Sequence, residues 1–301
     1  MLRILLFVAT NAAVLIMMTA LFQWLGLGEF LDRQGVHLNL SALLVMSALI
    51  GMSGSVISLA LSKWMAKTSM GVYVIDQSQN RTEAWLVSTV ERLARQAGIG
   101  MPEVGIFPSP DPNAFATGMD RNNALVAVST GLLEIMDAEE IEAMLGHEIT
   151  HAANGDMVTL ALLQGVLNTF VYFFATIIGH LVDRTLFQSA DEEGNYYGYG
   201  PGYYLTQMVA QIALGILATI IVMWFSRWRE FRADAGGARL AGRHKMIAAL
   251  EALRRYAEPR DLPGEFAAFG INGGIGRGLA RLFMSHPPIE ERIEALRRMR
   301  G

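Results

Sequence analysis

The chain has 301 residues, enough for a membrane bundle with one compact soluble domain but hardly for two large independent soluble domains. Apolar residues make up 52% of it and charged residues only 17%, and the mean hydropathy of +0.32 favours membrane association. A net charge of -4 with no long basic run argues against a nucleic-acid partner, and the absence of cysteine excludes disulfides and thiolate metal sites. A metal ion would therefore need histidine and carboxylate ligands.

Four apolar runs predict membrane-spanning helices. They cover about residues 4–25, 40–61, 157–178 and 205–225, and each is long enough to cross a bilayer. A signal peptide is the alternative for the first run. That run is longer than the apolar part of most signal peptides, and no clear small-x-small cleavage site follows it. We therefore expect a retained anchor and about four transmembrane helices.

The basic residues predict how these helices are oriented. The two loops on the far side, about residues 26–39 and 180–204, contain only Arg33 and Arg184, and the other basic residues fall on the near side. Basic loops stay in the cytoplasm. We therefore expect both termini to be cytoplasmic, with two transmembrane helices in 1–65, a first cytoplasmic segment in 66–156, a transmembrane hairpin in 157–226 and a second cytoplasmic segment in 227–301.

The cytoplasmic segments have a mixed α+β pattern. Apolar spacing predicts an amphipathic helix over 81–98, and short strands are expected at 103–107, 113–117 and 124–129, the last two as a hairpin. Asp137 and Glu140 form a capping-box pattern for the next helix. Further helices are expected at 230–240, 245–256 and 289–299, and the glycine-rich stretch 264–278 is expected to be a flexible flap or linker.

The helix that begins near Asp137 carries a metal-binding pattern. His147 and His151 stand four residues apart, so both imidazoles lie on one helix face and can reach the same zinc ion, with Glu148 beside them. A carboxylate at that place can take a proton from an attacking water. The alternative is that all three are ordinary surface residues, but the pattern lies on a predicted helix, as its chemistry requires.

The third ligand is expected downstream, where Glu230 and Asp234 also stand four residues apart. We assign Glu230 as the ligand and Asp234 as the acceptor of a histidine N–H. A solvated helix face balanced by neighbouring arginines is the alternative. Two membrane crossings between His151 and Glu230 return the chain to the same side, so the predicted topology allows a shared site.

These residues resemble those of the HtpX family of heat-shock membrane proteases and, more distantly, the CAAX prenyl-protein endopeptidases. The resemblance rests on residues 113–118 (NAFATG), 147–156 (HEITHAANGD), 230–234 (EFRAD) and 285–292 (SHPPIEER). It implies a gluzincin-like zinc metalloprotease domain facing the cytoplasm at the bacterial inner membrane, with one zinc per subunit. It also implies an endopeptidase that degrades misfolded or damaged membrane proteins, alongside other quality-control proteases.

The resemblance suggests two further sets of site residues. One is an edge strand that holds extended substrate by its backbone, formed by Asn113, Ala114, Phe115 and Ala116. Packing of a simple hairpin is the alternative. His286 and Arg292 match residues that in relatives approach the tetrahedral intermediate, where they would stabilise its negative charge. The alternative is that His286 only begins the last helix.

Two other functions stay open. One is a processing protease with a single defined substrate, such as a prenylated peptide. The other is a membrane scaffold or transporter in which His147, His151 and Glu230 hold a structural or transported metal. Glu148 argues against the second, because a structural zinc needs no base beside an open coordination position.

Overall fold

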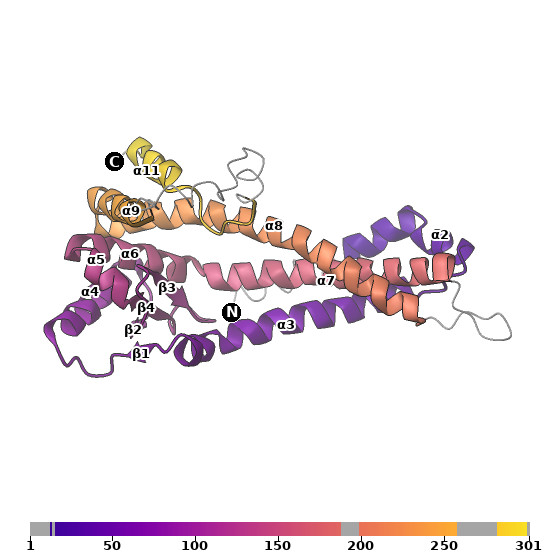
Figure 1. Cartoon of the computed structure of the whole chain (residues 1–301), viewed down its shortest axis with the longest axis horizontal. Coiled ribbons are helices and arrows are strands. Elements are labelled where there is room, and N and C mark those ends of the chain that lie inside the picture. The colour runs from indigo at the N-terminus through magenta and orange to yellow at the C-terminus, as the bar shows by residue number, and fades with distance from the viewer. Residues whose placement is uncertain (1–12, 14–15, 188–198, 258–281, 300–301) are drawn as a thin grey trace, which may run out of the picture. The chain divides into compact units, whose positions relative to one another are not determined.

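The computed structural model describes residues 13, 16–187, 199–257 and 282–299 (Figure 1). Within these ranges, helices α3 (Leu40–Ser69) and α8 (Pro201–Ala241) are long and apolar enough to cross a membrane, as is α7 (Asp156–Val182) with the π-helical turn Asp183–Phe187 that continues it. These helices match the last three predicted spans. Half of the first predicted span, the glycine-rich stretch 264–278 and residues 188–198 of the far loop lie outside the described residues.

The chain divides into two compact units, and the first combines residues 1–57 with 161–222. In it the ring of Phe22 stacks on Phe173 with centroids 4.9 Å apart. A Cβ at Gly51 of α3 would come within 2.5 Å of the Thr169 backbone nitrogen, so α3 and α7 approach closely there. Residues 26–39, expected to be a loop, include the short helix α2 (Leu27–Arg33).

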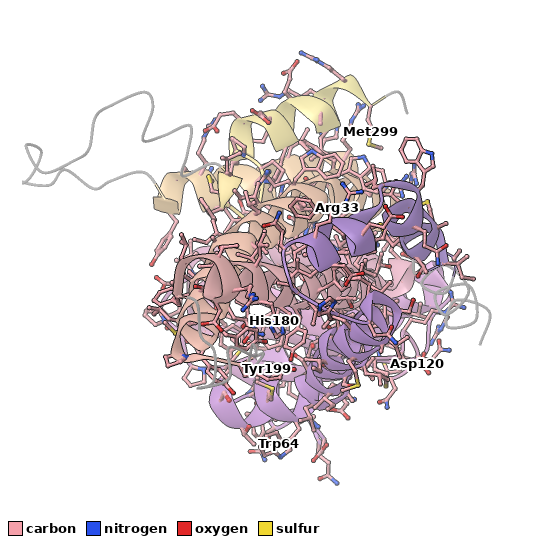
Figure 2. The ribbon with its side chains drawn as sticks, turned by 90° about the vertical axis from the view of Figure 1, so that its right-hand side faces the viewer. Arg33, Trp64, Asp120, His180, Tyr199 and Met299 are labelled. Atoms are coloured by element: carbon pink, nitrogen blue, oxygen red, sulfur yellow. The ribbon has the colours of Figure 1, made fainter. Side chains whose placement is uncertain are left out.

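A polar and aromatic cluster joins α7 to the start of α8 in this unit (Figure 2). His180 is buried in this cluster, and its ring lies 4.5 Å from that of Tyr203 and 5.1 Å from that of Tyr199. Asp183, also buried, accepts the backbone N–H groups of Gly200 and Tyr203 and so caps the start of α8. The hairpin of α7 and α8 is therefore fixed by specific contacts at this end.

The second unit combines residues 58–160 with 223–301 and contains one four-stranded sheet. The strands are β1 (Tyr73–Val74), β2 (Glu103–Phe107), β3 (Ala114–Thr117) and β4 (Leu125–Ser129), in the order β1-β2-β4-β3. The predicted hairpin is confirmed, because β3 pairs antiparallel with β4, and β4 pairs parallel with β2. Strand β1 and the short helix α5 (Thr130–Ile135) were not among the predicted elements.

Both faces of this sheet are covered, which is why β4 is buried along its whole length. Val126 and Val128 face a core built from helices α4 (Arg81–Ala97), α6 (Ala138–Asn154), α9 (Arg243–Ala257) and α11 (Ile289–Arg298). Leu125 and Ala127 face the C-terminal end of α3, through Ala66. The sheet thus lies between α3 and the helix that carries the histidine pair.

Candidate active site

Helix α6 is fixed at both ends by local interactions. Asp137 accepts the N–H groups of Glu139 and Glu140, and the Glu140 carboxylate returns a hydrogen bond to the Asp137 N–H, so the predicted capping box is present. Gly155 ends the helix with a positive φ of 68°. His147 and His151 lie on the last turns of this buried helix, where their rings are held in place by the surrounding core.

Helix α8 supplies the acidic residues. We expected Glu230 and Asp234 to lie in a separate helix. They lie instead in α8, which continues the helix of the fourth apolar run without a break from Pro201 to Ala241. Both carboxylates are buried. A buried charge requires a compensating partner, so their burial itself indicates cationic or metal neighbours.

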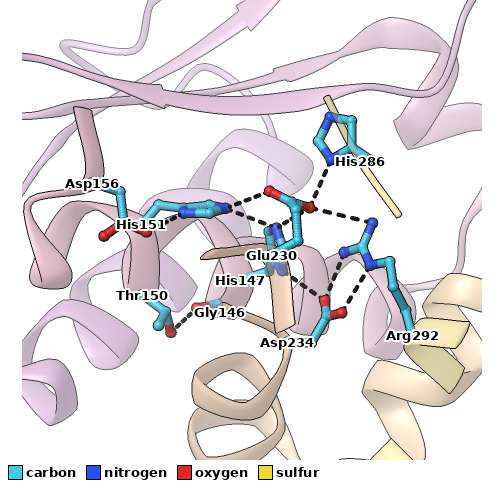
Figure 3. Close-up of polar contacts among 9 residues, drawn as sticks. All are labelled: Gly146, His147, Thr150, His151, Asp156, Glu230, Asp234, His286 and Arg292. Carbon is cyan, nitrogen blue, oxygen red and sulfur yellow. Dashed lines mark hydrogen bonds and ion pairs between the residues drawn. The ribbon is translucent and has the colours of Figure 1, made fainter. Parts of the chain in front are cut away.

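The three predicted ligands converge on one point (Figure 3). His151 Nε2 lies 3.1 Å from His147 Nε2 and 3.1 Å from Glu230 Oε1, and His147 Nε2 lies 3.6 Å from Glu230 Oε2. Ligands about 2.0–2.1 Å from a tetrahedral zinc are roughly 3.3 Å apart, so these separations fit a zinc ion between the three side chains. A His2Glu set that leaves a fourth position for water is typical of a catalytic zinc site.

Each histidine is supported through its other ring nitrogen. His147 Nδ1 lies 2.9 Å from Asp234 Oδ1, a close contact although not aligned as a hydrogen bond, and His151 Nδ1 lies 2.7 Å from Asp156 Oδ2. A carboxylate at that nitrogen leaves Nε2 free to bind a metal and raises its basicity. The Asp234 carboxylate therefore lies beside the His147 nitrogen that faces away from the other two ligands.

Each supporting carboxylate is in turn paired with a buried arginine. Arg292 of α11 makes a two-pronged contact with Asp234, at 2.8 and 2.6 Å, and Arg229 of α8 pairs with Asp156. The site therefore contains two chains of the same design, His147–Asp234–Arg292 and His151–Asp156–Arg229.

Electrostatics keep the ligand carboxylate charged. Burial acts to raise the pKa of Glu230, but hydrogen bonds with His151 and His286 outweigh it and hold the pKa well below its usual range. Burial likewise acts to raise the pKa of Asp234, and the guanidinium of Arg292 holds that pKa low. Both carboxylates are thus available in their anionic form.

Glu148 has the opposite tendency. Its side chain is buried, and because burial outweighs the attraction of His147 and His151, its pKa lies above that of an ordinary glutamate. A carboxylate with a raised pKa is a better proton acceptor, as a general base requires.

The remaining predicted site residues lie in the same unit. His286 Nδ1 is 2.6 Å from Glu230 Oε2, and the His286 side chain is 61% exposed, so it covers the ligand from the solvent side. Arg292 is buried and its Nη1 lies 3.4 Å from Glu230 Oε2. Residues 113–116 lie in and just before β3, the last strand in the sheet order, which packs against α6.

Two site residues were missed from the sequence. Asp156 stands inside the motif 147–156 that carried the resemblance, but it was given no role, and Arg229 was considered only as a solvated charge. The usable signal was Gly155: a glycine that ends α6 turns the chain so that the next side chain can return toward the last helical turn.

Comparison with known proteins agrees with this geometry. Residues 80–300 match the model of peptidase family M48. The chain is 62% identical over 297 residues to the protease HtpX of Thioalkalivibrio sulfidiphilus, covering 99% of each chain, and 60% identical to the protease HtpX homologue of Nitrosomonas europaea, covering 98% of each. The fold is also similar to the crystal structure of S. mikatae Ste24p, with a TM-score of 0.60 at 16% identity, over 95% of this chain and 64% of the other. The chain therefore belongs to peptidase family M48, as a zinc metalloprotease of the HtpX kind.

Proposed function

We propose that this membrane metalloprotease is an endopeptidase that degrades misfolded or damaged membrane proteins at the bacterial inner membrane, on its cytoplasmic side. The observation that carries the proposal is the convergence of His147, His151 and Glu230 beside the buried carboxylate of Glu148. The high identity to HtpX proteases and the three candidate membrane helices support the membrane setting.

The residues of the site divide the chemistry between them. The two histidines and Glu230 would hold a zinc ion, which when bound would make a water molecule more acidic and polarise the peptide carbonyl. Glu148 takes a proton from the attacking water as the C–O bond forms, and gives it to the departing amine nitrogen as the C–N bond breaks. We assign His286, which is exposed and next to Glu230, to donate a hydrogen bond to the oxyanion of the reacting carbonyl, and Arg292 to add positive charge from behind Glu230.

Strand β3 is suited to hold a substrate in extended form. Ser129 N donates to Asn113 O, and with the register Ala114↔Val128 this makes Phe115 and Thr117 the residues that bond to β4. The backbone groups of Ala114 and Ala116 therefore point away from β4, toward the edge on which the described residues place no further strand. Backbone pairing there depends little on substrate side chains, which suits many different unfolded substrates.

The topology and partners are part of the proposal. Both termini and the segments 66–156 and 227–301 are assigned to the cytoplasm, with membrane segments in 1–65 and 157–226, and the enzyme is expected to work beside other membrane quality-control proteases. The chain has no cysteine, so single cysteines report topology cleanly. His37→Cys is expected to react with an impermeant reagent applied outside the cytoplasmic membrane, and Ile135→Cys, at an exposed position, only after permeabilisation.

The decisive experiment compares wild type with Glu148→Gln after purification in detergent with a chelator, followed by addition of zinc. Cleavage of several unrelated unfolded proteins is measured together with zinc content. We expect the variant to bind zinc and to lose about two to four powers of ten in cleavage rate, the usual contribution of a general base. Zinc binding without cleavage by wild type would favour a metal-binding scaffold, and cleavage of a single substrate would favour a processing protease.

A further inference from the structure

The sheet is oriented relative to α3 by two contacts at opposite ends of β2. At its start, Glu103 Oε1 lies 3.0 Å from Lys63 Nζ, and its other oxygen pairs with Lys67. At its end, Pro108 follows β2 and lies next to Gly71, just beyond α3. Strand β2 therefore runs alongside α3 in the same direction, from Lys63 toward the helix end.

This arrangement decides which end of the sheet is near the membrane. The apolar run of α3 ends at Leu61, and Lys63 and Trp64 follow it, as cationic and aromatic residues do at a bilayer surface. Trp64 is 63% exposed and points outward from the ribbon (Figure 2). The end of the sheet that contacts Lys63 thus lies at the level of the lipid head groups, and the end near Gly71 lies farther into the cytoplasm.

The turn between β3 and β4 belongs to the near end. Lys63 Nζ donates to Asn123 Oδ1 at 2.8 Å and to the Asn123 carbonyl at 3.2 Å. A Cβ at Gly118 would meet the Lys63 stem at 3.5 Å, so the turn rests on that side chain. The neighbouring segment is fixed to it as well, because Gly100 N donates to Asn122 Oδ1.

The surface at this end of the sheet combines exposed apolar side chains with a basic one. Met101 is 45% exposed and Met119 is 50% exposed, and Arg121 is also exposed. The turn also contains one exposed carboxylate, Asp120, which accepts the Asn122 N–H. Exposed methionines with a neighbouring arginine fit the boundary between lipid head groups and acyl chains.

We propose that this surface, formed by Met101, Met119 and Arg121, rests in the bilayer interface next to α3. Since β3 runs antiparallel to β2 and β4, its Thr117 end lies at the membrane and its Ala114 end points into the cytoplasm. A polypeptide paired with β3 would then extend directly from the lipid surface. The pairing of a substrate polypeptide with β3 rests on the proposed function, but the contact of this surface with the membrane does not.

The test uses single cysteines carrying a nitroxide label in the naturally cysteine-free chain. Met101→Cys and Met119→Cys are compared with Ile135→Cys, an exposed apolar position of α5 at the opposite end of the sheet. The proteins are reconstituted in vesicles of phosphatidylcholine and phosphatidylglycerol. Collisions of each label with oxygen, which enters lipid, and with a water-soluble nickel complex are then measured.

We expect the labels at 101 and 119 to meet oxygen more and nickel several-fold less than the label at 135. Equal nickel accessibility at all three positions would overturn the proposal. In a second measurement, Met119→Asp should make the label at 101 more accessible to nickel, while Met119→Leu should not, with zinc content confirming that both variants are folded. No change on Met119→Asp would also overturn it. Both readouts are independent of proteolysis, so they separate this inference from the proposed function.

Discussion

The contribution of Asp156 to the zinc site can be measured apart from its contribution to stability. Asp156 contacts His151 on one side and Arg229 on the other, and all three side chains are largely buried. Loss of such a carboxylate behind a metal ligand typically lowers metal affinity about 10- to 100-fold, or about 1.4 to 2.7 kcal/mol. Removing it also leaves Arg229 as an unpaired buried charge, which costs about 3 to 5 kcal/mol of stability.

Three variants separate these effects. Asp156→Asn keeps an acceptor for the His151 ring and should fall at the lower end of the affinity range, and Asp156→Ala at the upper end. In Asp156→Asn with Arg229→Met, the unpaired charge is removed, so the unfolding free energy should largely recover while zinc affinity stays low. Zinc affinity is measured by competition with a coloured chelator, and stability by denaturant unfolding with zinc removed. Recovery of affinity together with stability would refute the reasoning, because the zinc loss would then be a consequence of poor folding.

Three further outcomes are expected. Ala116→Pro removes an N–H at the free edge of β3 and should raise KM for unfolded substrates without lowering zinc content, whereas Phe115→Pro removes a bond to β4 and should destabilise the fold. Removal of zinc should abolish cleavage and lower the unfolding temperature, and the shift should grow with the zinc concentration of the reference sample. Partial burial acts to raise the pKa of Glu142, but Lys245 and Arg92 hold it below the ordinary value of 4.5. Glu142 therefore contributes stability at neutral pH that is lost as the pH falls below about 4.5 toward the lowered folded-state pKa, and Glu142→Gln should flatten this part of the unfolding-midpoint profile.

The local parts of this site were readable from the sequence because a helix fixes its own geometry. A spacing of four residues places His147 above His151 and Glu230 above Asp234 whatever the rest of the chain does. The capping box at Asp137 and the β3–β4 hairpin are equally local, and both are confirmed. The first strand was missed because a two-residue strand has no periodicity to detect.

The missed parts depend on how separate elements pack. Whether Arg229 is a solvated charge or the partner of Asp156 is decided by the approach of α8 to the start of α7, which no pattern in either helix specifies. The contacts of Lys63 with Glu103 and Asn123 join residues 40 and 60 positions apart. The surroundings of His180 depend on packing in the same way, since only the folded hairpin brings the rings of Tyr199 and Tyr203 around it.

The ion pair of Asp156 with Arg229 also makes the metal site sensitive to the relative position of α7 and α8, the helices that enter the membrane. Asp156 is the first residue of α7, and Arg229 directly precedes Glu230 in α8, so one ion pair joins the two helices where the ligands meet. A shift of α8 along α7 by a single residue would move Glu230 by about 1.5 Å relative to His151. Metal–ligand distances tolerate only about 0.2 Å, so such a shift would break the site. The pair Asp156–Arg229 opposes that movement, and bilayers that strain the α7–α8 hairpin should weaken zinc binding before they unfold the domain.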